Sequence, residues 1–460
     1  MLNKNEEYVG LVDGLGTDGE GIVKIEGTTA FVPFCLIGER VKFKVLKVKD
    51  NIAYGKLIAV VSPSKDRVIP HCPVFGKCGG CALQHMDYSA QLQFKRSAVS
   101  NALLKIGGIS FPVNEAVSCA NEYGYRNKLA LPVGRVNGET VIGFYAPRSH
   151  RIVPIDNCDI QAEWVKKVIS AVKEFVATGI CGYDEESGTG ELRHIVVREI
   201  KGKFIFALVC TKKTDLSPFA DILKKSFKQF TLLLNINPEK TNAIFGKSFY
   251  TVYGDGFFGA EECGIKYRAG ANTFIQVNDD MRAKLYSAVL EEADEGAEAI
   301  DLYSGGGLLT AMLAKKCGRA YGVEIVEEAS RCADDLKNEN GLNGKMFNIC
   351  GKVEEEIEKV FAKTHSRRII VCDPPRKGIE RSSVNAIKNS GADKIIYISC
   401  NPATLARDLG IITGTLIEKD GALVKCADPQ SSYEIKSITP FDMFPQTRHI
   451  ETVAVLSRKR

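Results

Sequence analysis

The chain has 460 residues, of which 45% are hydrophobic and 25% charged, and its formal net charge is +5. It is long enough to bury more than one core and is expected to divide into about three domains. Its polar, acidic start is unlike a secretory signal and no run reaches about 18 apolar residues, so an exported or membrane-attached protein is not expected. The 15 cysteines therefore predict reduced thiols in a cytoplasmic protein, used as metal ligands or in catalysis.

Residues 7–61 form the first predicted unit. Short alternating runs separated by glycines predict a small, five-stranded β-barrel of the OB type. Arg40, Lys42 and Lys44 share one face of a predicted strand, with apolar residues at the positions between them. Such a basic ribbon can follow a phosphate backbone, although an ordinary solvated face is equally consistent with the sequence.

A cysteine-rich loop comes next. Cys72, Cys78 and Cys81 lie close together, and Cys158 is selected as the fourth ligand of a tetra-thiolate site. The spacing departs from the paired motifs of structural zinc ribbons, but thiolates suit both zinc and iron–sulfur clusters, so the residues alone leave both open. Residues 62–106 carry six Lys and Arg against two Asp, an excess that would attract nucleic acid.

Residues 107–271 predict a mixed α+β region. The stretches 125–128 and 143–150 combine cationic with aromatic residues. A stacking platform for single-stranded RNA needs this combination, but half-buried strand residues would give the same sequence pattern. Strand-like runs are expected at residues 128–133, 194–198 and 204–209.

From Ala271 onward, strands alternate with helices, which predicts a parallel sheet. A glycine-rich turn at 304–307 joins a strand to a helix, and Glu324 ends the next strand about 20 residues later. This pattern fits a nucleotide cofactor such as NAD. The three consecutive glycines depart from the spacing that holds a pyrophosphate, however, and Asp373 ends a later strand before two prolines. An S-adenosylmethionine methyltransferase explains the combination better.

Cys400 lies between an apolar run at 395–398 and a helix that Asn401 can cap and Pro402 can begin. A helix N-terminus favours thiolate over thiol, so Cys400 is a candidate nucleophile. A buried core cysteine is the alternative. The carboxyl end of a strand in an open α/β sheet favours the nucleophile, because ligands bind there.

Together, the later motifs closely resemble those of the RNA 5-methyluridine methyltransferases. The start of the chain resembles the TRAM module of RNA-modifying enzymes, and with the four cysteines it resembles the branch that modifies 23S ribosomal RNA. The resemblance implies an α/β Rossmann-like S-adenosylmethionine methyltransferase domain at 272–460, preceded by an OB-like TRAM barrel at 1–61 and a mixed α+β central domain at 62–271. The motifs that carry it are residues 274–278, 301–307, 324, 373–376, 399–402 and 447–453.

The resemblance also implies roles for individual residues. Cys400 matches the nucleophile and Glu451 the general base, although without the family Glu451 could be a surface acid of a strand. The protein is expected to be a monomer that methylates C5 of uridine in 23S rRNA through a covalent adduct between Cys400 and C6. The residues implied to bind S-adenosylmethionine are Gln276, Tyr303, Glu324 and Asp373, and those implied to hold a [4Fe–4S] cluster are Cys72, Cys78, Cys81 and Cys158.

Three other functions fit parts of the sequence. A transfer-RNA 5-methyluridine enzyme would share the catalytic half, though such enzymes usually lack the TRAM-like start and the cysteine loop. An amino-group methyltransferase could use the acid before two prolines, but it would not need Cys400. A non-catalytic iron–sulfur protein that binds RNA or carries electrons would leave the cofactor motifs unexplained.

Overall fold

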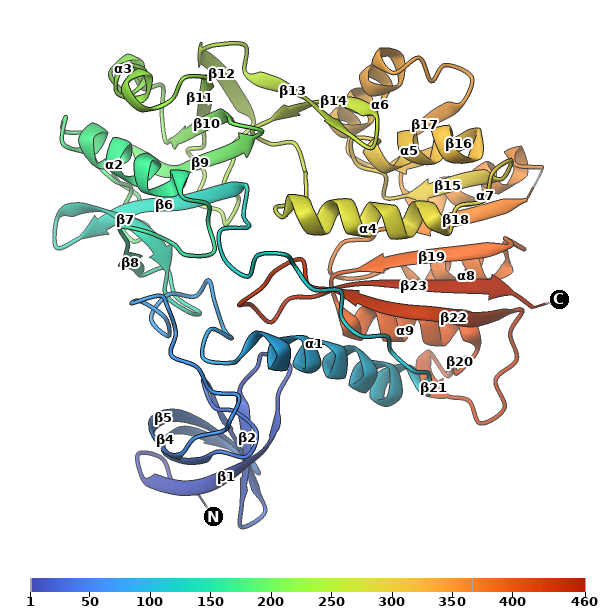
Figure 1. The fold of residues 1–460 in the computed structure, drawn as a ribbon, viewed down its shortest axis with the longest axis horizontal. Coiled ribbons are helices and arrows are strands. Elements are labelled where there is room, and N and C mark those ends of the chain that lie inside the picture. Colours follow the sequence, from blue (N-terminus) through green and yellow to red (C-terminus); the bar gives the residue numbers. More distant parts are fainter. Residues whose placement is uncertain (1, 366, 460) are drawn as a thin grey trace.

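The computed structural model describes residues 2–365 and 367–459. The chain folds into a barrel and two large sheets, which follow one another in Figure 1 from blue to red. Among these described residues, no helix is long and apolar enough to cross a membrane.

The N-terminal barrel is closed, in the strand order β1-β2-β3-β5-β4. Along β4, buried Val41, Phe43 and Val45 alternate with basic residues that reach solvent, as the sequence predicts. Lys42 forms an ion pair with Glu7 at 2.7 Å, so part of the basic ribbon is neutralised within the barrel. The strands are β1 (Glu7–Leu15), β2 (Gly21–Ile25), β3 (Thr28–Val32), β4 (Arg40–Lys49) and β5 (Ile52–Ser62).

The second sheet has seven strands in the order β12-β11-β10-β9-β6-β7-β8. Its central strands β9 and β10 are buried along nearly their whole length. Helices α2 (Trp164–Val176) and α3 (Ser217–Ser226) share a hydrophobic core with one face of this sheet. The strands are β6 (Lys128–Val136), β7 (Glu139–Tyr145), β8 (Ile152–Pro154), β9 (Leu192–Ile200), β10 (Lys203–Cys210), β11 (Phe230–Ile236) and β12 (Ser248–Tyr253).

The third sheet, in the order β17-β16-β15-β18-β19-β23-β22, carries the candidate site. Its first five strands are parallel to one another, and β23 runs antiparallel to both of its neighbours, β19 and β22. Two hairpins lie outside the large sheets, β13 (Phe257–Glu262) with β14 (Ile265–Gly270) and β20 (Leu416–Lys419) with β21 (Ala422–Lys425). The strands of the third sheet are β15 (Glu298–Leu302), β16 (Arg319–Glu324), β17 (Met346–Cys350), β18 (Arg368–Cys372), β19 (Lys394–Ser399), β22 (Tyr433–Phe441) and β23 (Glu451–Arg458).

Helices cover both faces of this third sheet, as expected for buried parallel strands. One core contains buried residues of α4, α5 and α6, and the opposite core contains those of α7, α8 and α9. The helices are α4 (Asp279–Glu291), α5 (Leu308–Cys317), α6 (Glu327–Glu339), α7 (Val353–Lys363), α8 (Arg381–Asn389) and α9 (Pro402–Thr413).

Helix α1 (Tyr88–Ala102) lies far from the third sheet in the sequence but packs against it. It continues into a π-helical turn at Leu103–Gly107. Val99 and Leu103 are fully or almost fully buried in the core that contains α9. Figure 1 shows α1 running beneath β22 and α9, between the barrel and the sheet.

Candidate active site

A cavity of about 930 Å³ lies at the carboxyl edge of the third sheet. Its walls come from the ends of β15, β16, β18 and β19, from the start of β23 and from the segment before α4. This edge is where open α/β sheets bind ligands. The structure brings together here all six residues that the sequence singled out for catalysis and cofactor binding, namely Gln276, Tyr303, Glu324, Asp373, Cys400 and Glu451.

The glycine turn after β15 leaves its backbone open to a ligand. A Cβ atom added at Gly305 or Gly306 would have no heavy atom within 4 Å. Gly307 differs from both, because a Cβ there would lie 2.6 Å from that of Ala333, and its φ is +79°. Glycine is therefore needed at 307 so that α5 can begin against α6, while the two glycines before it face free space.

Glu324 closes the same turn from the neighbouring strand. Its two carboxylate oxygens accept hydrogen bonds from the backbone N–H groups of Gly305, at 2.9 Å, and Val326, at 2.8 Å. These bonds fix the carboxylate at the end of β16, beside the open backbone. The predicted position of this acid, one strand away from the glycines, is confirmed.

Two further carboxyl groups lie deep in the site. Burial raises the pKa of Asp301 and that of Asp373 to about 7. Asp301 accepts a hydrogen bond of 2.6 Å from Thr310, which fixes it behind the glycine turn. Both carboxyl groups can therefore change charge near neutral pH.

The strand order places Cys400 beside Glu451, although they are 51 positions apart in the sequence. Strands β19 and β23 are antiparallel, and Ser399 pairs with Thr452. The next residue along each strand in the direction of the cavity is Cys400 on one side and Glu451 on the other. Both line the cavity.

Asn401 holds the backbone after Cys400. Its side chain accepts a hydrogen bond of 3.0 Å from Ala403 N–H and donates one of 3.0 Å to the carbonyl of Arg376. The predicted N-cap and the helix start at Pro402 are confirmed. These contacts tie the cysteine to the loop that follows Asp373.

The predicted preference for thiolate at Cys400 is wrong. Burial and the nearby carboxyl of Glu451 raise the pKa of the thiol to about 11, while Arg376 acts in the opposite direction. Burial also raises the pKa of Glu451 well above its usual value, and again Arg376 opposes the shift. Burial raises the pKa of the Cys400 thiol more than the helix N-terminus lowers it, because burial disfavours any isolated charge.

Arg376, Phe444 and His449 also line the cavity, although the sequence assigned them no role. The rings of Phe444 and His449 meet edge to face, with centroids 6.1 Å apart. Burial lowers the pKa of His449 to about 4, so the ring is neutral at neutral pH. Arg376 and His449 lie within recognised motifs and Phe444 lies three residues before one, and these positions were the available signal.

Cys72, Cys78, Cys81 and Cys158 line a second cavity, of about 400 Å³. Burial raises the pKa of Cys81 and of Cys158 to about 12. Within residues 2–365 and 367–459, however, no three His, Cys, Asp or Glu side chains are grouped closely enough to hold a metal ion. The four thiols that line this cavity are the kind of donor that a thiolate-held metal needs, but as described they are not drawn together around one.

The expected stacking platform at 125–128 is not formed by Tyr125. This side chain is buried, and its hydroxyl donates a hydrogen bond of 3.0 Å to the carbonyl of Pro445. The alternative, a half-buried strand residue, does not describe this ring either, because Tyr125 is buried and precedes β6.

Comparisons with known proteins agree with the fold. A family described as tRNA (Uracil-5-)-methyltransferase matches residues 87–459, and the TRAM domain matches residues 4–58. An uncharacterized RNA methyltransferase of Clostridium tetani is 38% identical over 99% of this chain and 97% of its own. Another, of Halalkalibacterium halodurans, is 39% identical over 100% and 98%.

A solved structure extends the similarity to three dimensions. The tRNA (uracil-54, C5)-methyltransferase of Pyrococcus abyssi, in complex with S-adenosyl-L-homocysteine, has a TM-score of 0.77 and is 26% identical, covering 97% of this chain and 99% of that one. The fold and the cavity thus define an S-adenosylmethionine-dependent RNA methyltransferase with an N-terminal TRAM barrel. The chain belongs to the RNA uracil-5-methyltransferase family.

Proposed function

We propose that this protein transfers a methyl group from S-adenosylmethionine to C5 of a uridine in 23S ribosomal RNA. The observation that carries the proposal is the one cavity that contains the predicted cofactor residues together with Cys400 and Glu451. Family membership supplies the reaction class, RNA uracil-5-methylation. The choice of ribosomal RNA rests on the resemblance of the TRAM barrel and the four cysteines, taken together, to the ribosomal branch.

Gln276, Tyr303, Glu324 and Asp373 are the residues that we propose bind the cofactor. The space beside Gly305 fits a ligand that lies against the backbone. The fixed carboxylate of Glu324 ends β16, where it can accept hydrogen bonds from ribose hydroxyls. When bound, S-adenosylmethionine supplies an electrophilic methyl group on a sulfonium.

Cys400 and Glu451 act at different steps of the reaction on the uracil ring. C5 of uracil is a weak nucleophile, so Cys400 Sγ first bonds to C6 and the π electrons of the C5–C6 bond move onto C5 as an enolate. C5 then takes the methyl group. Glu451 removes the proton from C5, the C5–C6 double bond forms again, and the bond between C6 and sulfur breaks to release the Cys400 thiolate.

Arg376 is the cation placed to assist the first of these steps. Cys400 must lose a proton before it can attack, and the surrounding protein raises the pKa of its thiol. The charge of Arg376 lowers the pKa of Cys400 and that of Glu451. The guanidinium therefore stabilises the anionic form of each group that the reaction needs.

A uridine paired inside folded RNA cannot reach this cavity. The base must be flipped out of its stack or presented in a loop before C6 can approach Cys400. Exposed Phe274, which lines the same cavity, is one apolar surface available to an extruded base.

Transfer RNA is the second candidate substrate, because a specific observation favours it. The Pyrococcus abyssi tRNA enzyme covers 97% of this chain. A similarity of that extent includes the N-terminal barrel, so the barrel alone does not separate the two substrate classes. The expectation that tRNA enzymes lack this region does not hold for that relative.

Methylation of RNA transcripts distinguishes the two candidates. With labelled S-adenosylmethionine, purified protein is expected to label unmodified 23S rRNA at uridine and to leave an unmodified tRNA pool unlabelled. Binding to the ribosomal transcript should weaken steeply as salt rises, because phosphate contacts release counterions. Labelling of tRNA with no labelling of ribosomal RNA would contradict the choice of substrate while leaving the reaction itself intact.

We also propose that the four cysteines of the second cavity hold a [4Fe–4S] cluster with a structural or RNA-positioning role. Its support is the donor set, since four thiols that line one cavity suit a metal held by thiolates. Methyl transfer to uracil is a substitution with no net redox change, so the proposed reaction needs no electron transfer from the cluster.

Anaerobic purification tests this assignment. The protein should be brown and contain about four iron atoms per chain, and Cys81→Ser should lose the iron. Cys181→Ser is the matched control, because Cys181 is exposed and lies outside the cavity. Stoichiometric zinc without iron in the anaerobic protein would refute the cluster.

A further inference from the structure

The loop 442–450 joins β22 to β23 and forms one wall of the active-site cavity. Phe444 and His449 from this loop line the cavity, and Glu451 follows it directly. The loop has no regular secondary structure of its own apart from turns. Contacts with neighbouring elements therefore help to hold its conformation.

Helix α1 supplies a buried ion pair to the start of this loop. Lys95 and Asp442 are both fully buried, and Lys95 Nζ lies 2.5 Å from Asp442 Oδ1. The same ammonium donates a second hydrogen bond, of 3.0 Å, to the carbonyl of Phe444. One cation thus fixes two points of the loop, a side chain and a backbone carbonyl two residues later.

Gln91, one turn earlier in α1, binds the middle of the loop. Its amide nitrogen donates to the side-chain oxygen of Gln446, and its oxygen accepts from the backbone N–H of Gln446, each at 3.0 Å. Gln446 has a φ of +68°, a conformation that costs free energy for a residue with a side chain. Its carbonyl accepts from the N–H groups of Ala82 and Leu83 at 3.1 and 3.0 Å.

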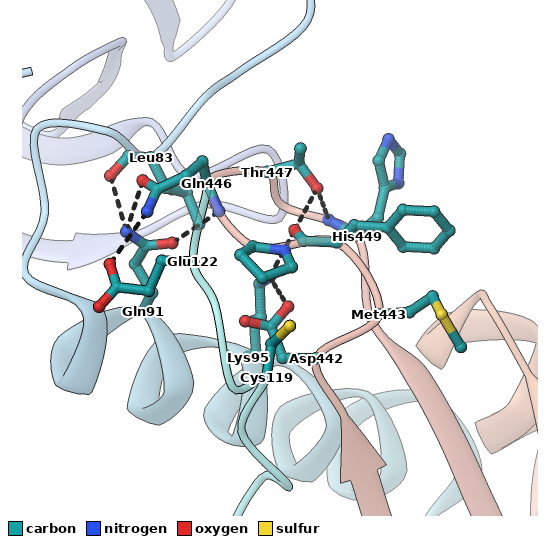
Figure 2. Close-up of polar contacts among 12 residues, drawn as sticks. Leu83, Gln91, Lys95, Cys119, Glu122, Asp442, Met443, Gln446, Thr447 and His449 are labelled. Carbon is teal, nitrogen blue, oxygen red and sulfur yellow. Dashed lines mark hydrogen bonds and ion pairs between the residues drawn. The ribbon is translucent and has the colours of Figure 1, made fainter. Parts of the chain in front are cut away.

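Figure 2 shows how these contacts reach the cavity wall. Thr447 Oγ1 donates to the carbonyl of Phe444, which Lys95 also binds, and it accepts the backbone N–H of His449 at 3.2 Å. A continuous series of hydrogen bonds therefore runs from α1 to the residue that precedes Ile450 and Glu451. His449 points away from α1 in this view, on the side opposite Gln91.

The ion pair is not required for packing alone. Replacing a buried ion pair by apolar residues of similar volume is often neutral or stabilising, because both charges must lose their water. An apolar pair, however, would leave the Phe444 carbonyl with the Thr447 hydroxyl as its donor and without the bond from α1. The pair adds directional contacts to the loop that hydrophobic packing would not supply.

We propose that Lys95 and Gln91 are positioning residues for the proton-removal step. They hold loop 442–450 in the conformation that places Glu451 at C5 of the uracil bound to Cys400. This inference rests on the proposed function. Neither residue lines the cavity, and the proposed cofactor residues lie on other elements. Loss of the anchor should therefore slow the second half of the cycle and spare the binding of S-adenosylmethionine.

The test uses two variants. One removes the buried ion pair, and the other removes the contacts that Gln91 makes with the loop. Lys95→Met combined with Asp442→Leu replaces both charges, so no unpaired charge remains. Gln91→Met removes the two bonds to Gln446 and adds no charge. The control replaces an inter-helix ion pair far from the cavity, Lys225→Met with Glu174→Leu, whose charges lie 2.7 Å apart on α3 and α2.

Three quantities are measured in each folded variant: affinity for S-adenosylmethionine, the rate of covalent trapping on RNA containing 5-fluorouridine, and turnover on ordinary RNA. We expect affinity and trapping to stay within about twofold of wild type and turnover to fall at least about tenfold, which is less than the roughly 10²- to 10⁴-fold expected when the general base itself is lost. The covalent RNA complex should accumulate on ordinary RNA, as in a Glu451→Gln variant. The control should match wild type in all three.

Unchanged turnover in both test variants would overturn the proposal. So would an equal fall in affinity, trapping and turnover, which is the signature of a merely structural role. If wild-type protein methylates RNA but never forms the trapped complex, the adduct mechanism fails instead, and the step assigned to the anchor fails with it.

Discussion

Replacing Cys400 by alanine is expected to abolish methyl transfer to RNA and to leave binding of S-adenosylmethionine intact. Without a thiolate at C6, C5 does not become nucleophilic enough to accept the methyl group. The loss should be at least about 10⁴-fold, as for other enzymes that lose a covalent nucleophile. Label transferred from tritiated S-adenosylmethionine to RNA measures it.

Cys181→Ala is the matched control for this variant. Cys181 is exposed and lies outside both cavities, so its loss should leave activity at the wild-type level. Appreciable methylation by Cys400→Ala would show that another residue, or no residue, adds to C6.

Replacing Glu451 by glutamine is expected to separate the two halves of the cycle. The amide keeps the size of the side chain but cannot accept the C5 proton, so the methyl group should be transferred once and the product should remain attached to the enzyme. Steady-state turnover should fall by about 10²- to 10⁴-fold, the usual contribution of a general base. Rapid-quench measurement should show a burst of about one methyl group per enzyme.

Glu434→Gln provides the comparison. Glu434 lies on the adjacent strand β22 and pairs with Lys436 at 2.5 Å near the surface. Its replacement should change neither the burst nor the turnover. Normal turnover by Glu451→Gln would remove Glu451 from the role of base.

Local sequence signals predicted much of the candidate site because each is contained within a few residues. The Asn401 cap, the start of α9 at Pro402 and the glycine turn after β15 follow from side-chain and backbone preferences that act over a single turn. The strand-end acids follow from the alternation of strands and helices, which brings the carboxyl ends of parallel strands to one edge.

Features that depend on distant parts of the chain could not be predicted in this way. Lys95 and Asp442 are 347 positions apart, and nothing near either residue indicates the other. The prediction that Cys400 prefers the thiolate form was wrong for a related reason. The helix N-terminus is visible in the sequence, but the burial and the neighbouring Glu451 that oppose it arise from the tertiary fold.

Trapping on 5-fluorouridine RNA tests whether Cys400 forms a covalent bond to C6 of the target uridine. Fluorine cannot leave C5 as a proton does, so wild-type protein with S-adenosylmethionine should remain attached to the RNA through denaturing electrophoresis. Proteolysis and mass spectrometry should then find the methylated nucleotide on the peptide that contains Cys400. A nucleotide attached to any other residue, or RNA that is methylated with no attached protein, would contradict the covalent role of Cys400.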